Sequence, residues 1–116
     1  MLVIEAVPRA VLAPLMWGMR RDNVTLFRGE CVTYAALKDG VPVGCICVSH
    51  GYVKGLYVKP EHRWAGIGTK LIAHVSTTAG RPLETSASKM SITGFLRNGW
   101  EVVHRYKCGR AHMKLA

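Results

Sequence analysis

The chain has 116 residues, 49% of them apolar, and a formal net charge of +9 at pH 7. The apolar content excludes a disordered tail, and the length predicts one domain spanning residues 1–116. The charge favours anionic partners such as a phosphorylated ligand, an acidic protein or a nucleic acid; a basic surface without such a partner is the alternative.

The first half of the chain predicts a helix among strands. Apolar residues recur at helical spacing from Val11 to Met19, and Pro14 predicts that this helix starts late or kinks. Asp39-Gly40 between two strand-like runs predicts a hairpin turn, and Gly51 ends the second run. The expected elements are a strand over 2–7, a helix over 11–21, a loop or short helix over 22–30, and strands over 31–37, 41–48 and 52–58.

The second half predicts two helices alternating with strands. An apolar stripe that includes Ile67 and Leu71 predicts a helix, which Gly80 is expected to cap and Pro82 to stop. The further elements are a strand over 82–86, a helix over 88–98 that ends at Gly99, and strands over 100–106 and 111–116 joined by a turn over 107–110. The order β-α-β-β-β-α-β-α-β-β predicts a mixed sheet flanked by helices.

Cysteine usage predicts reduced thiols. Cys45 and Cys47 lie two apart in an expected strand, so they share a face and cannot easily bridge. Neither they nor Cys31 and Cys108 show the spacing of a zinc site, and we expect no metal. The run 11–19 is too short to span a bilayer. We therefore expect a cytoplasmic protein without a membrane segment.

The loop between the strand over 52–58 and the next helix predicts an anion site. It reads Arg63-Trp64-Ala65-Gly66-Ile67-Gly68. The first N–H groups of a helix lack internal partners and carry partial positive charge, and glycines let a phosphate approach them. Lys59, His62, Arg63 and Lys70 add cationic or titratable side chains. A P-loop does not fit, because Gly68-Thr69-Lys70 has the wrong order, and Leu71 replaces the third glycine of a dinucleotide fingerprint.

Two segments resemble the GNAT superfamily of N-acetyltransferases. The first is Arg-x-x-Gly-x-Gly over 63–68, after a strand ending Val58-Lys59-Pro60; it resembles the family's acetyl-CoA loop. The second is 88–100, where Ser91 is the usual small residue and Gly99-Trp100 matches a closing Gly-Phe. The resemblance covers about two-thirds of the chain. It implies an α/β (α+β) fold with a mixed, mostly antiparallel central sheet of six to seven strands flanked by helices.

The resemblance also implies the ligand and its contacts. Acetyl-CoA would bind with its pyrophosphate on the loop amides and its pantetheine arm along the strand over 52–58, where two parallel strands splay apart. A backbone N–H near Val58 would polarise the thioester carbonyl. The residues expected to bind coenzyme A are Leu56, Tyr57, Val58, Arg63, Trp64, Ala65, Gly66, Ile67, Gly68, Thr69 and Lys70.

The proton-transfer residues depart from the family pattern. The tyrosine that usually protonates the leaving thiolate falls at Phe95, which has no hydroxyl, and Ser88 stands at a frequent asparagine position. The strand over 52–58 carries no carboxylate. The remaining candidate bases are His50, Tyr52, Glu84 and, more remotely, Glu30, each of which also has a plain surface or packing interpretation.

The sequence therefore predicts an N-acetyltransferase that uses acetyl-CoA and an amine acceptor. The acceptors that fit are a protein lysine or N-terminus, with an acidic protein among the candidates, or a small amine. A second copy of the chain, in a homodimer, is a further candidate partner. One alternative is a catalytically impaired module that keeps the fold and either binds coenzyme A or serves in structure or interaction. A nucleic-acid-associated basic protein is another, although no helix shows a basic stripe with interleaved aromatic residues.

Overall fold

The computed structural model describes residues 1–22, 24 and 31–116. Most of the segment over 22–30, including the candidate base Glu30, lies outside the described residues. The elements are β1 (Leu2–Ala6), the 3-10 helix η1 (Arg9–Leu12), α1 (Ala13–Arg21), β2 (Val32–Lys38), β3 (Val41–Ser49), β4 (Tyr52–Val58), the 3-10 helix η2 (Pro60–His62), α2 (Ile67–Thr78), β5 (Leu83–Ala87), α3 (Ile92–Arg97), β6 (Glu101–Arg105) and β7 (Ala111–Leu115).

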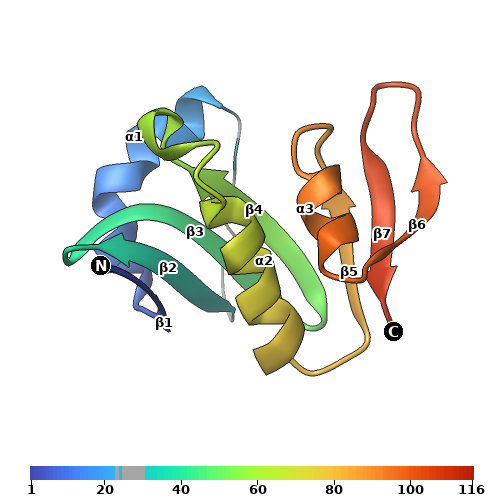
Figure 1. Ribbon diagram of the computed structural model, residues 1–116, viewed down its shortest axis with the longest axis horizontal. Helices are drawn as coiled ribbons and strands as arrows, with labels where there is room; N and C mark the ends of the chain where they lie inside the picture. The colour runs from blue at the N-terminus through green and yellow to red at the C-terminus, as the bar shows by residue number, and fades with distance from the viewer. Residues whose placement is uncertain (23, 25–30) are drawn as a thin grey trace.

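The described strands form one seven-stranded sheet in the order β1-β2-β3-β4-β5-β7-β6. All neighbours are antiparallel except β4 and β5, which are parallel. Figure 1 shows α2 and α3 in front of the sheet, and α1 beside the half formed by the first strands. The predicted mixed, mostly antiparallel sheet flanked by helices is confirmed.

The two faces of the sheet carry separate apolar clusters. Successive residues of a strand point to opposite faces, so Ala35 and Cys45 pack with α1 whereas Ala36 and Ile46 pack with α2. The cluster under α2 and α3 is the larger and continues through β5 and β7. It holds α2 and α3 against this face of the sheet.

Both tight turns of the first half are glycine turns. Asp39 (φ 51°) and Gly40 (φ 83°) join β2 to β3 in the left-handed region, as a two-residue hairpin loop requires. His50 (φ 50°) and Gly51 (φ 79°) do the same between β3 and β4. The hairpin predicted at Asp39-Gly40 and the break predicted at Gly51 are confirmed.

Helix starts and ends differ in detail from the predictions. Pro14 lies in the first turn of α1, which begins at Ala13, so the late start is confirmed. The prediction that Gly80 caps α2 is wrong. The chain already leaves the helix at Ala79, whose N–H donates to the Val75 carbonyl, and Arg81 Nη2 donates to the Ser76 carbonyl at 3.2 Å. These two bonds satisfy terminal carbonyls of the helix without a left-handed cap.

Helix α3 is shorter than the predicted 88–98. Ser91 and Ile92 donate their N–H groups to the carbonyl of Ser88 at 3.0 and 3.2 Å, which forms a turn ahead of the helix. The predicted end at Gly99 is confirmed, because Gly99 has φ 84° and Trp100 donates its N–H to the Phe95 carbonyl at 3.1 Å.

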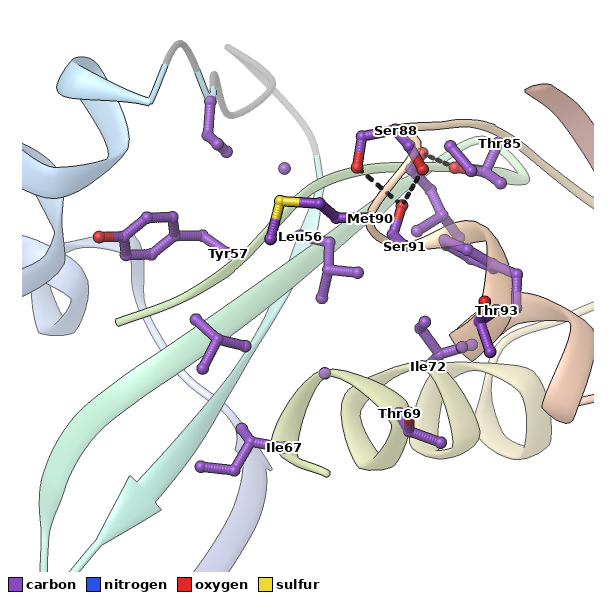
Figure 2. A pocket seen from close by; sticks show the side chains of 18 of the residues that line it. Leu56, Tyr57, Ile67, Thr69, Ile72, Thr85, Ser88, Met90, Ser91 and Thr93 are labelled. Atoms are coloured by element: carbon purple, nitrogen blue, oxygen red, sulfur yellow. Dashed lines mark hydrogen bonds between the residues drawn. The ribbon is translucent and has the colours of Figure 1, made fainter. Parts of the chain in front are cut away.

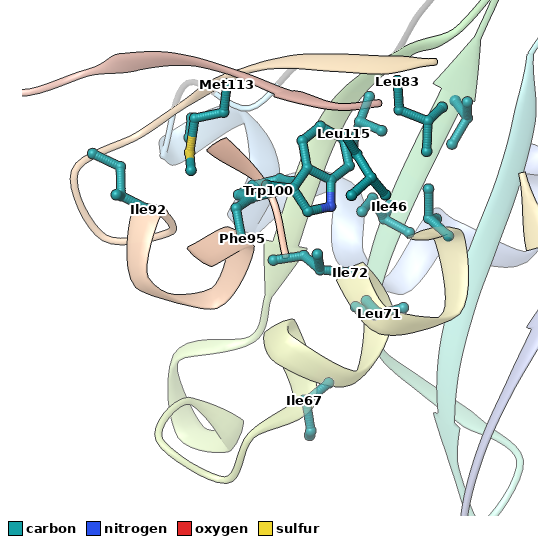
Figure 3. Close-up of a cluster of buried hydrophobic side chains, with 14 of the residues drawn as sticks. Ile46, Ile67, Leu71, Ile72, Leu83, Ile92, Phe95, Trp100, Met113 and Leu115 are labelled. Atoms are coloured by element: carbon teal, nitrogen blue, oxygen red, sulfur yellow. The ribbon is translucent and has the colours of Figure 1, made fainter. Parts of the chain in front are cut away.

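Trp100 fastens the end of α3 to α2. Its indole ring packs edge-on against Phe95, with ring centroids 4.9 Å apart. Its indole N–H donates to the Ser76 hydroxyl of α2 at 2.8 Å, and Ser76 in turn donates to the Ile72 carbonyl at 2.7 Å. Figure 3 shows Trp100 between Phe95 and Leu115. Both helices are therefore held in a fixed relation beside the opening in the sheet.

Candidate functional site

The sheet opens between its two parallel strands. β4 and β5 pair only at Tyr52–Glu84 and Val53–Thr85. The Thr85 hydroxyl then donates to the Val53 carbonyl at 2.9 Å, where a further strand amide would otherwise bond. Beyond this point the strands are not paired, although β4 continues to Val58 and β5 to Ala87. The result is a notch inside the sheet, bordered by backbone on both sides.

A bulge in β4 lies at the level of the notch. Cys45 pairs with Tyr57 and Cys47 with Lys54, so Gly55 and Leu56 together face the single residue between the two cysteines. Gly55 has φ 79°, a conformation that glycine adopts without strain. The bulge changes the alternation of β4: Val53 and Leu56 are three residues apart and yet both pack with the α2 side. It therefore turns the backbone of β4 next to the opening.

The notch is part of a groove of about 1120 Å³. The groove is bordered by β4, the loop before α2, the start of α2, β5 and α3. In Figure 2, Ser88 and Ser91 lie across it from Leu56, with Ile67 and Thr69 on α2 below. Among the residues predicted to bind or react, those that line it are Tyr52, Leu56, Tyr57, Val58, Arg63, Trp64, Gly66, Ile67, Gly68, Thr69 and Ser88; His50, Ala65, Lys70 and Glu84 do not.

The N-terminus of α2 opens into this groove without a side-chain cap. Gly66 is the N-cap residue in the left-handed conformation (φ 77°, ψ 10°), and the first turn has no acidic residue. A Cβ at Gly66 would meet nothing within 4 Å, and one at Gly68 would meet only a Val58 methyl at 3.7 Å. The protein's own packing therefore leaves space at Gly68. An anion can approach the first helical amides there, so the residues present fit a phosphate group.

Arg63 holds the loop in place through hydrogen bonds within the protein. Its Nε donates to the Val58 carbonyl and its Nη2 to Asp22 Oδ2, both at 2.9 Å, and the guanidinium lies 5.7 Å from the Tyr57 ring centre. The hydrogen bond from Arg63 is the main cause that lowers the pKa of Asp22. Burial, followed by the Asp22 carboxylate, raises the pKa of Tyr57. Arg63 therefore joins the loop to β4 and to the end of α1, and its contact with a phosphate stays a prediction.

The wall formed by β5 and α3 carries hydroxyl groups. Ser88 Oγ lies 3.0 Å from Ser91 Oγ, and Ser91 Oγ donates to the Ser88 carbonyl at 3.1 Å. Thr93 also lines the groove. Phe95 lines it as well but is 2% exposed and packs against Trp100. At the position of the family's tyrosine, the groove therefore has an apolar ring, and the hydroxyls come from the turn before α3.

Arg110 completes the β5 side of the notch. It donates from Nη2 to the Ser86 carbonyl at 2.8 Å and from Nε to the Ser86 hydroxyl at 3.3 Å. This carbonyl lies just beyond the last β4–β5 pair, so Arg110 takes the place of a strand partner. It comes from the turn between β6 and β7.

The candidate bases within the described residues have different surroundings, although Tyr52 and Glu84 are register partners on β4 and β5. Glu84 is half exposed, and its Oε1 lies 2.9 Å from His112 Nε2 on β7. His50 is exposed in the β3–β4 turn. Tyr52 alone of these lines the groove. The sequence does not show the Glu84–His112 contact, because it depends on the pairing of β5 with β7.

Three further features of the described residues concern metal binding, membrane-spanning helices and a buried thiol. Over 1–22, 24 and 31–116, no three His, Cys, Asp or Glu side chains are placed to hold a metal ion. In the same ranges, no helix combines the length and apolar character needed to cross a membrane. Burial raises the pKa of the Cys45 thiol to about 12, so this cysteine is a packed side chain under α1.

Comparisons with known proteins agree on one family. A sequence model described as the Acetyltransferase (GNAT) family matches residues 7–92. No curated protein matches the chain in sequence. A putative acyl-CoA N-acyltransferase from Klebsiella pneumoniae superimposes with a TM-score of 0.68 at 23% identity, covering 98% of this chain and 96% of that one. Arabidopsis thaliana NAA60 in complex with acetyl-CoA gives a TM-score of 0.71 at 12% identity, covering 98% and 96%. N-acetylglutamate synthase from Neisseria gonorrhoeae with coenzyme A gives 0.69 at 15%, covering 98% of this chain and 34% of that one.

Proposed function

The chain belongs to the GNAT acetyltransferase family, and we propose that it is an N-acetyltransferase that moves the acetyl group of acetyl-CoA to an amine by direct attack. One observation carries the proposal. The notch between β4 and β5 and the uncapped N-terminus of α2 open into the same groove. A ligand with a diphosphate at one end and a thin, amide-bearing arm suits this arrangement.

The wall of β4 and α2 would bind by its backbone. The N–H groups at the start of α2 would bind the diphosphate, since Gly66 and Gly68 leave the approach open. The bulge at Gly55 turns the β4 backbone at the notch, where an N–H would polarise the thioester carbonyl. Arg63 would keep this wall rigid through its bonds to Val58 and Asp22. Preorganised donors of this kind need no rearrangement as charge develops.

Acetyl-CoA supplies an acetyl group activated as a thioester. In the transfer, a C–N bond forms as the C–S bond breaks, one proton leaves the amine nitrogen and one reaches the sulfur. The chain's part is to hold the two reactants together and to provide a route for these protons. Tyr52, which lines the groove, would be on the route of the proton that leaves the amine. The Ser88–Ser91 pair would be on the route of the proton that reaches the sulfur.

A second candidate is a module that binds coenzyme A without efficient turnover. Phe95 favours it, because its buried ring offers no proton where the family has a tyrosine. The two candidates share the same binding groove and differ only in the rate of transfer. A protein that binds acetyl-CoA but releases no thiol with any amine tested would fit this second candidate.

The experiment combines binding and turnover. Titration calorimetry with acetyl-CoA tests the groove, and release of free thiol with a panel of peptides and small amines tests transfer. Binding followed by amine-dependent thiol release would support the transferase. The absence of acetyl-CoA binding to the folded protein would overturn both candidates.

A further inference from the structure

The cationic side chains around the groove differ in what they contact. Among the residues that the structure describes, the basic side chains that line it are Lys54, His62, Arg63, Arg97 and Arg110. Arg63 bonds to the Val58 carbonyl and to Asp22, and Arg110 bonds to Ser86. Each of these arginines thus donates from Nε and Nη2 to groups of the protein. They stabilise the edges of the notch, where strand partners are missing.

Arg97 is in a different situation. Within the part of the chain that the structure describes, no hydrogen bond, ion pair or ring contact involves its side chain. Its side chain is exposed and lines the groove. Asp22 is the one acidic side chain among the described lining residues, and Arg63 already binds it. The charge of Arg97 therefore faces the groove without a carboxylate to neutralise it.

The position of Arg97 on α3 brings it to the start of α2. Gly94, three residues earlier, packs so closely that an added Cβ would lie 3.0 Å from Ile72 and 3.4 Å from the Thr69 hydroxyl. Asn98, four residues after Gly94, donates from Nδ2 to the Thr69 carbonyl at 3.3 Å. Residues three and four apart share a helix face, so Arg97 lies on the face that contacts the first turn of α2.

We propose that Arg97, and not the loop residue Arg63, is the arginine that contacts a phosphate of coenzyme A beside the N-terminus of α2. The proposal rests on the proposed function, since it assigns a residue to the same ligand. The helix amides offer partial charge and the guanidinium adds a full one. An arginine without a protein partner can form these bonds without first breaking others.

The test compares arginine variants by calorimetry with acetyl-CoA at several salt concentrations. Arg97→Gln should weaken binding about tenfold, the effect of losing one hydrogen bond to a charged group, and leave Tm unchanged. It should also make the affinity less dependent on salt. Arg97→Lys, which keeps the charge, should recover part of the loss. Arg105→Gln is the matched control, because Arg105 is an exposed arginine on β6 outside the groove.

Arg63→Gln should behave in the opposite way. It should lower Tm, because it breaks the bonds to Val58 and Asp22, and keep the wild-type salt dependence of the remaining affinity. If Arg97→Gln binds as wild type does, or lowers only Tm as a helix-terminal charge would, the proposal is wrong. It is also wrong if the loss of salt dependence appears in Arg63→Gln instead. If the wild-type protein itself does not bind acetyl-CoA, the proposed function fails and this proposal fails with it.

A parallel titration with 3′-dephospho-coenzyme A identifies the phosphate. A tenfold loss in Arg97→Gln that persists with this ligand assigns the diphosphate, because the 3′-phosphate is absent. A loss that disappears assigns the 3′-phosphate. Each result supports the contact, and equal affinities of wild type and Arg97→Gln for both ligands would overturn it.

Discussion

The two walls of the groove are built from different chemistry. The first wall, formed by β4, the loop and α2 over residues 52–69, is continuous in sequence and presents glycines and backbone. The second wall, formed by β5, the following turn and α3 over residues 83–97, presents the side chains of Ser88, Ser91, Thr93 and Arg97. A wall that binds by backbone tolerates few substitutions, because each added Cβ changes the space. A wall that acts by side chains can exchange them and keep its fold.

Gly68→Glu changes the first wall and should have the largest effect of the variants, a loss of acetyl-CoA affinity. A glutamate there would place bulk and negative charge at the helix amides, and acetyl-CoA affinity should fall about 100-fold or more by calorimetry. Stability should change little, because the added Cβ would meet only a Val58 methyl at 3.7 Å. Gly80→Glu is the control, since its added Cβ meets nothing within 4 Å and Gly80 lies outside the groove. Normal acetyl-CoA binding by Gly68→Glu would show that the start of α2 does not bind the diphosphate.

Gly55→Ala should show whether the bulge serves the groove or only the sheet. Alanine in the left-handed conformation costs about 1–2 kcal/mol, so the free energy of unfolding in denaturant should fall by that amount. Thiol release should fall as well, because the bulge positions the β4 backbone at the notch. Gly40→Ala carries a similar φ of 83° in the distant β2–β3 turn and should lose stability alone. Equal activity losses in the two variants would assign the bulge a purely structural role.

Phe95→Tyr should sharpen the contrast on the second wall. The variant restores a hydroxyl at the position of the family's tyrosine, and general acid catalysis there should raise kcat about tenfold. This is less than a general acid typically contributes, because the nearby serine hydroxyls already donate part of the time. The measurement is steady-state thiol release with an amine that the wild type accepts. Phe95→Leu, which removes the ring without adding a hydroxyl, should not raise kcat. A lower Tm with unchanged kcat would mean that the hydroxyl is buried away from the groove.

How much the sequence predicts also differs between the walls. The first wall is local: the strand ending at Val58, the glycines of the loop and the apolar stripe of α2 are adjacent in sequence, so its elements could be predicted from it. The separation of β4 from β5 was expected only through the family resemblance, because strand pairing is not local. The bulge at Gly55 has no signal other than a glycine within a strand-like run.

The second wall depends on contacts between distant residues. The Arg110–Ser86 and Glu84–His112 contacts require the order β5-β7-β6, which periodicity does not reveal. Arg63 shows the same limit within the best-predicted motif. The motif predicts a phosphate ligand, and the sequence does not show that Asp22 lies within hydrogen-bond distance of its guanidinium.

Asp22→Asn should produce the smallest effect, and it tests how the first wall is held to α1. The pKa of Asp22 is lowered from its ordinary 3.8, mainly by the hydrogen bond from Arg63. A carboxyl group with a depressed pKa stabilises the fold above its ordinary pKa, and this contribution is lost as the pH falls through the folded value. Asp22→Asn should therefore have a lower Tm than wild type at neutral pH, and the difference should vanish in acid below the folded pKa. Because the pair is exposed, molar salt should also shrink the difference at neutral pH. A Tm difference that stays constant from neutral pH into acid would show that Asp22 contributes by packing. Arg63 would then hold the loop in place only through its hydrogen bond to the Val58 carbonyl.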